Sequence, residues 1–97
     1  MILTTTDSIE GHKIENYLGI ITGVSTNIKT SFSFKTEKNK SLYQNFINEA
    51  KEEAFQYLKT NATNLNANAV VGITIDIETS PNSYFFVSIT GTAVKVV

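Results

Sequence analysis

The side chains that could hold a hard metal ion or move a proton are carboxylates scattered along the chain. They include Asp7, Glu10, Glu15, Glu49, Glu52, Glu53, Asp76 and Glu78. No two of them stand at a spacing typical of a ligand set or an acid–base pair. Glu49 and Glu53 would share a helix face, but any solvated acidic helix shows the same four-residue spacing. The sequence therefore predicts no catalytic residues and favours a protein that is not an enzyme.

A soft metal ion would lack its usual ligands within one copy of the chain. There is no cysteine, the single methionine is Met1, and the single histidine is His12. Heavy metals prefer thiolate, thioether and imidazole ligands. An assembly of several chains could still gather copies of His12 around its axis, whereas otherwise His12 is an exposed turn residue. We expect no metal ligands within a subunit and no cofactor, and metal binding remains an alternative function.

The residues best suited to binding lie where a long predicted strand leads into a segment rich in Ser, Thr, Lys and Asn. Hydroxyl, amide and ammonium groups suit an anionic small molecule, because lysine acts as a point charge in a chain without arginine. Phe32 and Phe34 could stack on a planar ligand, or could instead anchor the segment to the core or to an interface. The predicted ligand-binding residues are Thr22, Ser25, Thr26, Asn27, Lys29, Phe32, Phe34 and Lys35.

Two strands are predicted in the first third of the chain. A short one covers residues 2–5, and alternating apolar residues predict a long one over residues 14–26. Gly19 and Gly23 lie on one face of the long strand and leave a groove without side chains. Such glycines mark a bulge or the close approach of another backbone. We expect a helix or a neighbouring subunit to press there.

Apolar residues recur at helical spacing after a loop at residues 27–40. Ser41 is the predicted N-cap, and the helix is predicted to end near residues 66–68, because asparagine tolerates the left-handed conformation needed there. The apolar stripe consists of Tyr43, Phe46, Ile47, Ala50, Ala54, Tyr57, Leu58, Ala62 and Leu65.

The last third of the chain predicts a hairpin. Residues 71–78 alternate between apolar and polar side chains, residues 80–83 form a turn, and residues 84–97 return as a strand. Apolar parity changes across Gly91, which predicts a bulge that swaps faces. The result is an α+β subunit of order ββαββ with a mainly antiparallel sheet. One helix covers one face only, so subunits are expected to cover the other.

Length and composition favour one soluble domain that associates with itself. At 97 residues the chain forms a single domain, 1–97, and its 18% of charged residues lies below the average of about 25%. The low charge indicates either a surface that faces other subunits or a surface on which Ser, Thr and Asn replace charged residues. A net charge of -1 and the absence of arginine argue against a nucleic-acid partner. The N-terminus lacks a basic and apolar leader, and no apolar run approaches the ~20 residues of a membrane span. We expect a cytoplasmic protein without a membrane partner.

Several segments resemble the YbjQ-like family of "putative heavy-metal-binding" domains. They are Thr4-Thr5-Thr6, Ile9-Glu10-Gly11, Ile14, Tyr17-Leu18-Gly19, Thr22-Gly23, Ala67-Asn68-Ala69-Val70-Val71-Gly72, Asp76 and Gly91-Thr92-Ala93-Val94. The resemblance implies a small α+β subunit that assembles into a ring, typically a homopentamer. Family members usually carry a Gly-, Asp- and Arg-containing stretch before the helix, whereas residues 25–40 here contain no arginine.

The segments that resemble the family would form the scaffold, whereas the loop at residues 25–40 differs from the family pattern. This combination suggests that the ligand differs as well. The favoured hypothesis is a homo-oligomer that sequesters an anionic or nucleotide-like molecule at its subunit interfaces without changing it. One alternative is the metal binding that the family name implies. Another is a structural ring that binds other proteins, which the long apolar C-terminal strand would support.

Overall fold

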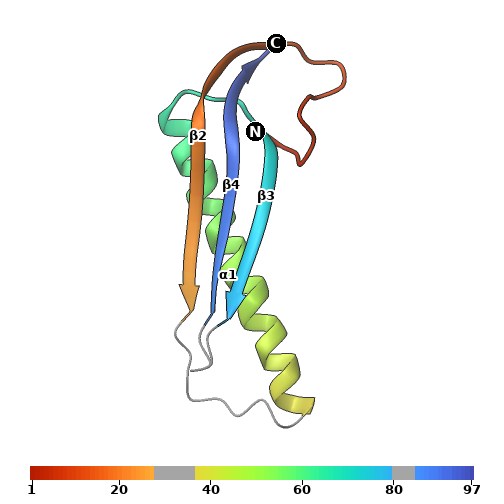
Figure 1. Ribbon diagram of the computed structural model, residues 1–97, viewed down its shortest axis with the longest axis vertical. Helices are drawn as coiled ribbons and strands as arrows, with labels where there is room; N and C mark the ends of the chain where they lie inside the picture. Colours follow the sequence, from red (N-terminus) through yellow and green to blue (C-terminus); the bar gives the residue numbers. More distant parts are fainter. Residues whose placement is uncertain (28–36, 80–84) are drawn as a thin grey trace.

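A four-stranded sheet carries one long helix on one of its faces (Figure 1). The computed structural model describes residues 1–27, 37–79 and 85–97. The elements are β1 (Ile2–Leu3), β2 (Ile14–Asn27), α1 (Glu37–Asn64), β3 (Ala69–Thr79) and β4 (Phe85–Val96). The strand order is β1-β3-β4-β2, with β1 parallel to β3 and the other pairs antiparallel. The sheet is therefore mixed, and the predicted α+β class and the order ββαββ are confirmed.

The helix begins earlier than predicted. It starts at Glu37, so the prediction of Ser41 as the N-cap is wrong. Residues 37–40 contain two lysines and a glutamate, which are good helix formers, and a glutamate at the first position favours the positive end of the helix dipole. No helix in the described parts of the chain is long and apolar enough to cross a membrane.

The helix ends as its asparagines predict. Asn66 has a φ of 62°, in the left-handed region. Its N–H donates to the Thr63 carbonyl at 2.9 Å, and the Ala67 N–H reaches back to the Ala62 carbonyl at 3.0 Å. These two hydrogen bonds satisfy carbonyls that the last turn would otherwise leave unpaired. The reversal delivers the chain directly into β3.

The main core lies between α1 and the strands β2 and β4. Ala54, Leu58 and Ala62 of the predicted helix stripe have no exposed surface. At Gly23 of β2, a Cβ atom would overlap the Ala54 carbonyl oxygen and would lie 2.6 Å from the Leu58 nitrogen. The helix backbone thus rests on the strand backbone, and the groove predicted at Gly23 is confirmed. Gly19 has a φ of +136° and follows a register shift between β2 and β4, as expected of a bulge.

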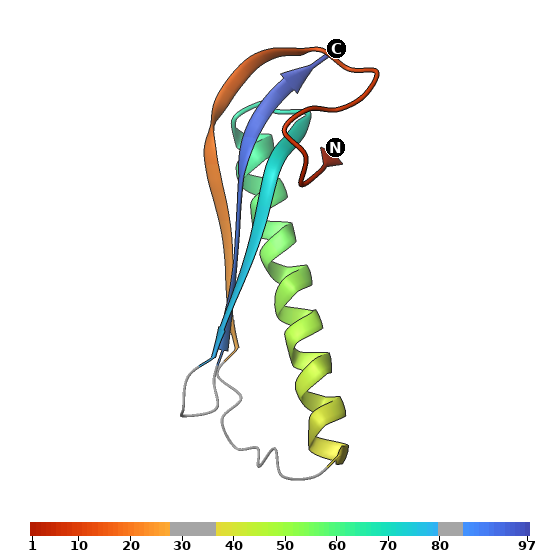
Figure 2. The same cartoon turned by 45° about the vertical axis from the view of Figure 1, so that its right-hand side comes forward.

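A second apolar cluster lies on the opposite face of the sheet, near the chain termini. Its buried members are Ala69, Val71, Val94 and Val96. The segment before β2 crosses this end of the sheet, and Ile9 packs against the cluster (Figure 2). The chain itself therefore covers part of the face that subunits were expected to cover.

The bulge predicted at Gly91 lies instead on the neighbouring strand. Gly91 pairs in regular register with Ile21, whereas the register between β3 and β4 shifts between Val71 and Thr74. Gly72, inside that shift, has a φ of +62°. Apolar parity changes along β4 because both of its faces are buried near its end, one by α1 and the other by the second cluster.

Asn68 fastens the end of β4 with its side chain. Its amide nitrogen donates to the Val96 carbonyl, and its amide oxygen accepts from the Val96 N–H, both at 2.8 Å. We expect Asn68→Ala to lower the free energy of unfolding by about 2 kcal/mol, because two half-buried backbone groups lose their partners. Urea unfolding measures the loss. Asn68→Asp keeps the acceptor but sets a carboxylate oxygen against the Val96 carbonyl, so it should also be destabilising. An alanine variant as stable as the wild type would contradict this account.

Candidate functional site

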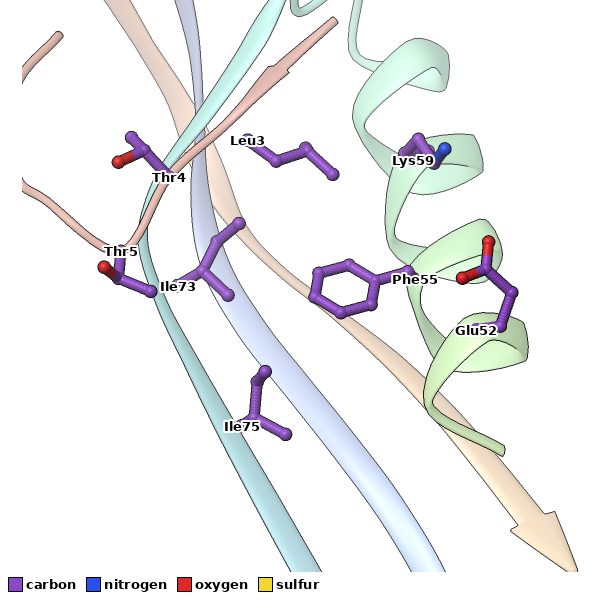
Figure 3. A pocket seen from close by; sticks show the side chains of 8 residues that line it. All are labelled: Leu3, Thr4, Thr5, Glu52, Phe55, Lys59, Ile73 and Ile75. Atoms are coloured by element: carbon purple, nitrogen blue, oxygen red, sulfur yellow. The ribbon is translucent and has the colours of Figure 1, made fainter. Parts of the chain in front are cut away.

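An open hollow of about 370 Å³ lies between α1 and the β1–β3 side of the sheet (Figure 3). It exists because α1 packs on β2 and β4 and leaves the helix side of β3 largely uncovered. Its lining residues come from three elements and the segment after β1. They are Leu3, Thr4, Thr5, Glu52, Phe55, Lys59, Ile73 and Ile75.

The walls of the hollow are apolar. Ile75 is the register partner of the buried Ile89, which places it on the helix side of the sheet, yet 41% of its surface is exposed. Ile73 is buried behind it, and the Phe55 ring extends from α1 toward Ile73 (Figure 3). Phe55 and Leu3 are half-buried. The hollow thus offers an aromatic ring and aliphatic side chains to a ligand, the usual composition of a small-molecule site.

The charged groups of the hollow both belong to α1. Glu52 and Lys59 stand three residues before and four residues after Phe55, so the three side chains share one helix face. Seven residues of α-helix separate the Cα atoms of the two charged residues by ~10 Å along the axis. The Glu52 Oε1 atom accepts a hydrogen bond from Gln56 at 3.2 Å. The site therefore has a negative end and a positive end with an aromatic ring between them.

The threonines of the hollow are held in place by backbone hydrogen bonds to β3. The Thr4 N–H donates to the Val70 carbonyl at 3.0 Å, and the Thr4 carbonyl accepts from the Ile73 N–H at 3.1 Å. The Thr6 carbonyl accepts from the Gly72 N–H at 2.8 Å. These bonds continue the pairing of β1 past Leu3 and across the bulge. The backbone of this segment is consequently fixed against β3, while the hydroxyls of Thr4 and Thr5 are directed away from α1 (Figure 3) and that of Thr4 lies 2.8 Å from the Thr6 hydroxyl.

This set of groups can hold a polar ligand. The charged groups among the lining residues are one carboxylate, on Glu52, and one ammonium group, on Lys59. Together they can orient a polar ligand over an apolar surface.

The described residues do not fit a heavy metal ion. Within residues 1–27, 37–79 and 85–97, no three His, Cys, Asp or Glu side chains come together as they would around a metal. His12 is exposed, and its Nδ1 atom lies 3.2 Å from the Val97 carbonyl oxygen. The chain has no thiolate to offer a soft metal, so we derive no metal chemistry from one subunit.

The predicted binding residues Thr22 and Ser25 point to opposite faces of β2. The Thr22 hydroxyl lies on the open face, 3.5 Å from the Thr90 hydroxyl. Ser25 is 3% exposed and donates to Glu53 of α1 at 2.9 Å. The structure therefore does not bring these two side chains together, and neither of them lines the hollow.

The side chains of the other predicted binding residues are not described by the structure. Thr26 and Asn27 belong to β2 and pair with Phe86 and Phe85 through their backbones. Lys29, Phe32, Phe34 and Lys35 lie outside the described residues. Ligand binding by these residues stays a prediction.

The sequence contains a signal for the helical side of the hollow that the predicted apolar stripe does not include. That stripe contains neither Phe55 nor the two charged residues, Glu52 and Lys59. The spacing of 52, 55 and 59 places an aromatic residue between opposite charges on one helix face, beside the buried alanine stripe. An aromatic residue in that position indicates a face that is neither fully buried nor simply solvated.

Comparison with known proteins identifies the family. The family model described as "Putative heavy-metal-binding" (YbjQ) matches residues 1–97. A UPF0145 protein of Anoxybacillus flavithermus is 37% identical, and the alignment covers 99% of this chain and 98% of that one. A UPF0145 protein of Geobacillus thermodenitrificans is 36% identical, with 99% of both chains covered.

The fold is shared with a solved structure. The crystal structure of a protein of unknown function from Pediococcus pentosaceus, assigned to the DUF74 family, superposes with a TM-score of 0.75. It covers 100% of this chain and 98% of that chain at 20% identity, which supports the fold alone. From the full-length family match and the relatives above 30% identity, the chain belongs to the YbjQ (UPF0145) family.

Proposed function

We propose that this protein is a non-enzymatic, self-associating protein that binds and sequesters an anionic or nucleotide-like small molecule. The observation that supports it most is the hollow beside Phe55. Its volume of about 370 Å³ falls within the ~300–1,000 Å³ typical of small-molecule sites. Its lining combines an apolar surface with one ammonium group and one carboxylate, and we propose that this set holds a ligand without cleaving it.

Self-association is supported by the free edge of β2. This strand is 14 residues long and lies at the end of the sheet order. Tyr17, Ile20 and Val24 pair with β4 residues of the face opposite α1, and they are 72%, 80% and 47% exposed. A long edge strand with exposed apolar side chains is a template for pairing with another chain. We propose that copies of this chain cover the edge in a ring, the homopentamer that the family resemblance implies.

Sequestration follows from binding without chemistry. A protein that holds a metabolite unchanged acts in proportion to its copy number and affinity, and a ring multiplies the number of sites per particle. In such a ring, residues at the end of β2 could approach a ligand from the neighbouring subunit. Interface pockets of that kind are part of this proposal.

The variant Ile20→Lys is expected to abolish self-association. Ile20 is 80% exposed on the β2 edge, and a lysine placed there would have to lose its hydration within an apolar contact. Light scattering coupled to size exclusion should show the mass of a single chain. Thr60→Lys adds the same charge on an exposed position of α1 and should leave the assembly unchanged. An intact assembly in the Ile20→Lys variant would contradict the proposed use of this edge.

Binding is tested by calorimetric titration of the assembled protein with nucleotides, nucleosides and sugar phosphates. At least one should bind, and the variant Thr5→Trp should abolish that binding, because the indole would fill the hollow from an exposed position on its rim. Absence of binding across all three classes would overturn the proposed function. Binding that Thr5→Trp leaves unchanged would place the ligand elsewhere.

A further inference from the structure

The hollow has a polarity that selects among small molecules. We infer that its ligand is a nucleoside monophosphate whose base carries an exocyclic amine, with the phosphate at Lys59 and the amine at Glu52. This inference rests on the proposed function and specifies the ligand class. It is carried by the order of groups along α1, which places a carboxylate, an aromatic ring and an ammonium group on one face.

The placement of the two charged residues favours an extended ligand. The Cα atoms of Glu52 and Lys59 are seven residues apart, ~10 Å along the helix axis. The ammonium and carboxylate groups of an α-amino acid are attached to one carbon atom, so such a molecule spans little of that distance. Inorganic phosphate reaches one end only. A nucleoside monophosphate carries its base edge and its phosphate at opposite ends of the molecule, as the site requires.

The middle of the hollow suits a planar ring. Phe55 extends into the space between α1 and β3, and Ile73 and Ile75 face it from the sheet (Figure 3). Bases stack on aromatic side chains at about 1–3 kcal/mol each, and this contact does not depend on the identity of the base. Stacking alone would therefore accept any base, and the discrimination must come from the ends of the site.

The Glu52 end prefers a ligand that donates a hydrogen bond. An ionised carboxylate only accepts hydrogen bonds. One of its oxygen atoms accepts from Gln56, and the carboxylate retains further acceptor capacity for an amine. A base with a carbonyl group in the same place would set two acceptors against each other. Sites built around a polar contact of this kind reject the mismatched analogue more strongly than apolar pockets do.

The Lys59 end completes the match. The half-buried Lys59 side chain supplies an ammonium group, which binds phosphate as a point charge. Thr4 and Thr5 line the opposite side of the hollow with their hydroxyls directed away from α1 (Figure 3), and the Thr4 hydroxyl pairs with that of Thr6. The polar contacts of the ligand are therefore assigned to Glu52 and Lys59.

The test is a titration of the assembled wild-type protein with AMP, adenosine, IMP and inorganic phosphate. AMP should bind. Adenosine should bind about tenfold more weakly than AMP because it lacks the phosphate. IMP should also bind about tenfold more weakly than AMP, because it carries a carbonyl group where AMP has the amine. Inorganic phosphate should not bind measurably. Equal affinity for AMP and adenosine, or for AMP and IMP, would overturn the inference.

Variants assign each preference to its residue. Lys59→Ala should bind AMP and adenosine with equal affinity. Glu52→Gln should lose the preference for AMP over IMP, because an amide can donate to a carbonyl as well as accept from an amine. Lys95→Ala removes an exposed lysine of β4 that lies outside the hollow and should behave as the wild type. Retention of both preferences in the two hollow variants would overturn the inference.

The result separates this inference from the proposed function. Another compound could bind the wild-type protein but not the Thr5→Trp variant, while none of the four probes binds. In that case the nucleotide assignment is wrong and the proposed function stands. If no compound of any class binds, both are wrong.

Discussion

Replacement of Gly23 by alanine is expected to lower the free energy of unfolding by about 3 kcal/mol, the upper end of the usual cost of over-packing. The added Cβ atom would overlap the Ala54 carbonyl oxygen and approach the Leu58 nitrogen to 2.6 Å. Both are backbone atoms of α1, so no side-chain rotation relieves the clash and the whole helix must move away from β2. Urea unfolding followed by circular dichroism measures the loss.

Gly11→Ala is the control for this substitution. Gly11 has a φ of +81° and no atom within 4 Å of an added Cβ, so its replacement costs backbone strain of about 1–2 kcal/mol without a clash. Gly23 shows the reverse case, a clash without a left-handed φ. A Gly23→Ala variant no less stable than Gly11→Ala would contradict direct contact between the backbones of α1 and β2.

Leu58→Ala is expected to lower the free energy of unfolding by about 3 kcal/mol, within the 2–5 kcal/mol typical of buried leucines. Leu58 has no exposed surface and is among the largest fully buried side chains. Its removal leaves a cavity between α1 and the sheet that the helix cannot close, because its backbone already rests on Gly23. Thermal and urea unfolding measure the effect.

Leu65→Ala provides the matched comparison. The same atoms are removed near the end of the helix, where Leu65 is 40% exposed, so the loss should be about 1 kcal/mol. Domains are stable by only ~5–15 kcal/mol, so the Leu58 variant should unfold at clearly lower urea concentration than the Leu65 variant. Equal losses would mean that α1 is not held by its buried stripe.

Local patterns in the sequence were sufficient to predict most of the scaffold. Alternating apolar and polar residues predict the strands β2, β3 and β4. Asn66 predicts the end of the helix, because asparagine is one of the few residues that tolerate a positive φ. Gly23 indicated where another backbone would approach. Each of these features depends on residues close together in the chain or on one residue's conformational range.

The features that were missed depend on distant parts of the chain. The bulge lies at Gly72 rather than at Gly91, and apolar parity in β4 alone could not distinguish a bulge from a strand buried on both faces. The hollow exists because α1 packs on β2 and β4 rather than on β3, and this position of the helix leaves Ile75 uncovered. It also depends on parallel pairing that brings Thr4 to Ile73, almost seventy residues away along the chain.

Native mass spectrometry of the protein purified without chelator tests the central claim most directly, because one spectrum reports the number of subunits and any retained ligand. We expect an oligomer that carries a few hundred daltons of added mass per site, lost in the Thr5→Trp variant. A bare oligomer to which no added nucleotide binds, or a mass increment the size of a metal ion that chelator removes, would contradict the small-molecule function. A bare monomer would also contradict the assembly through β2.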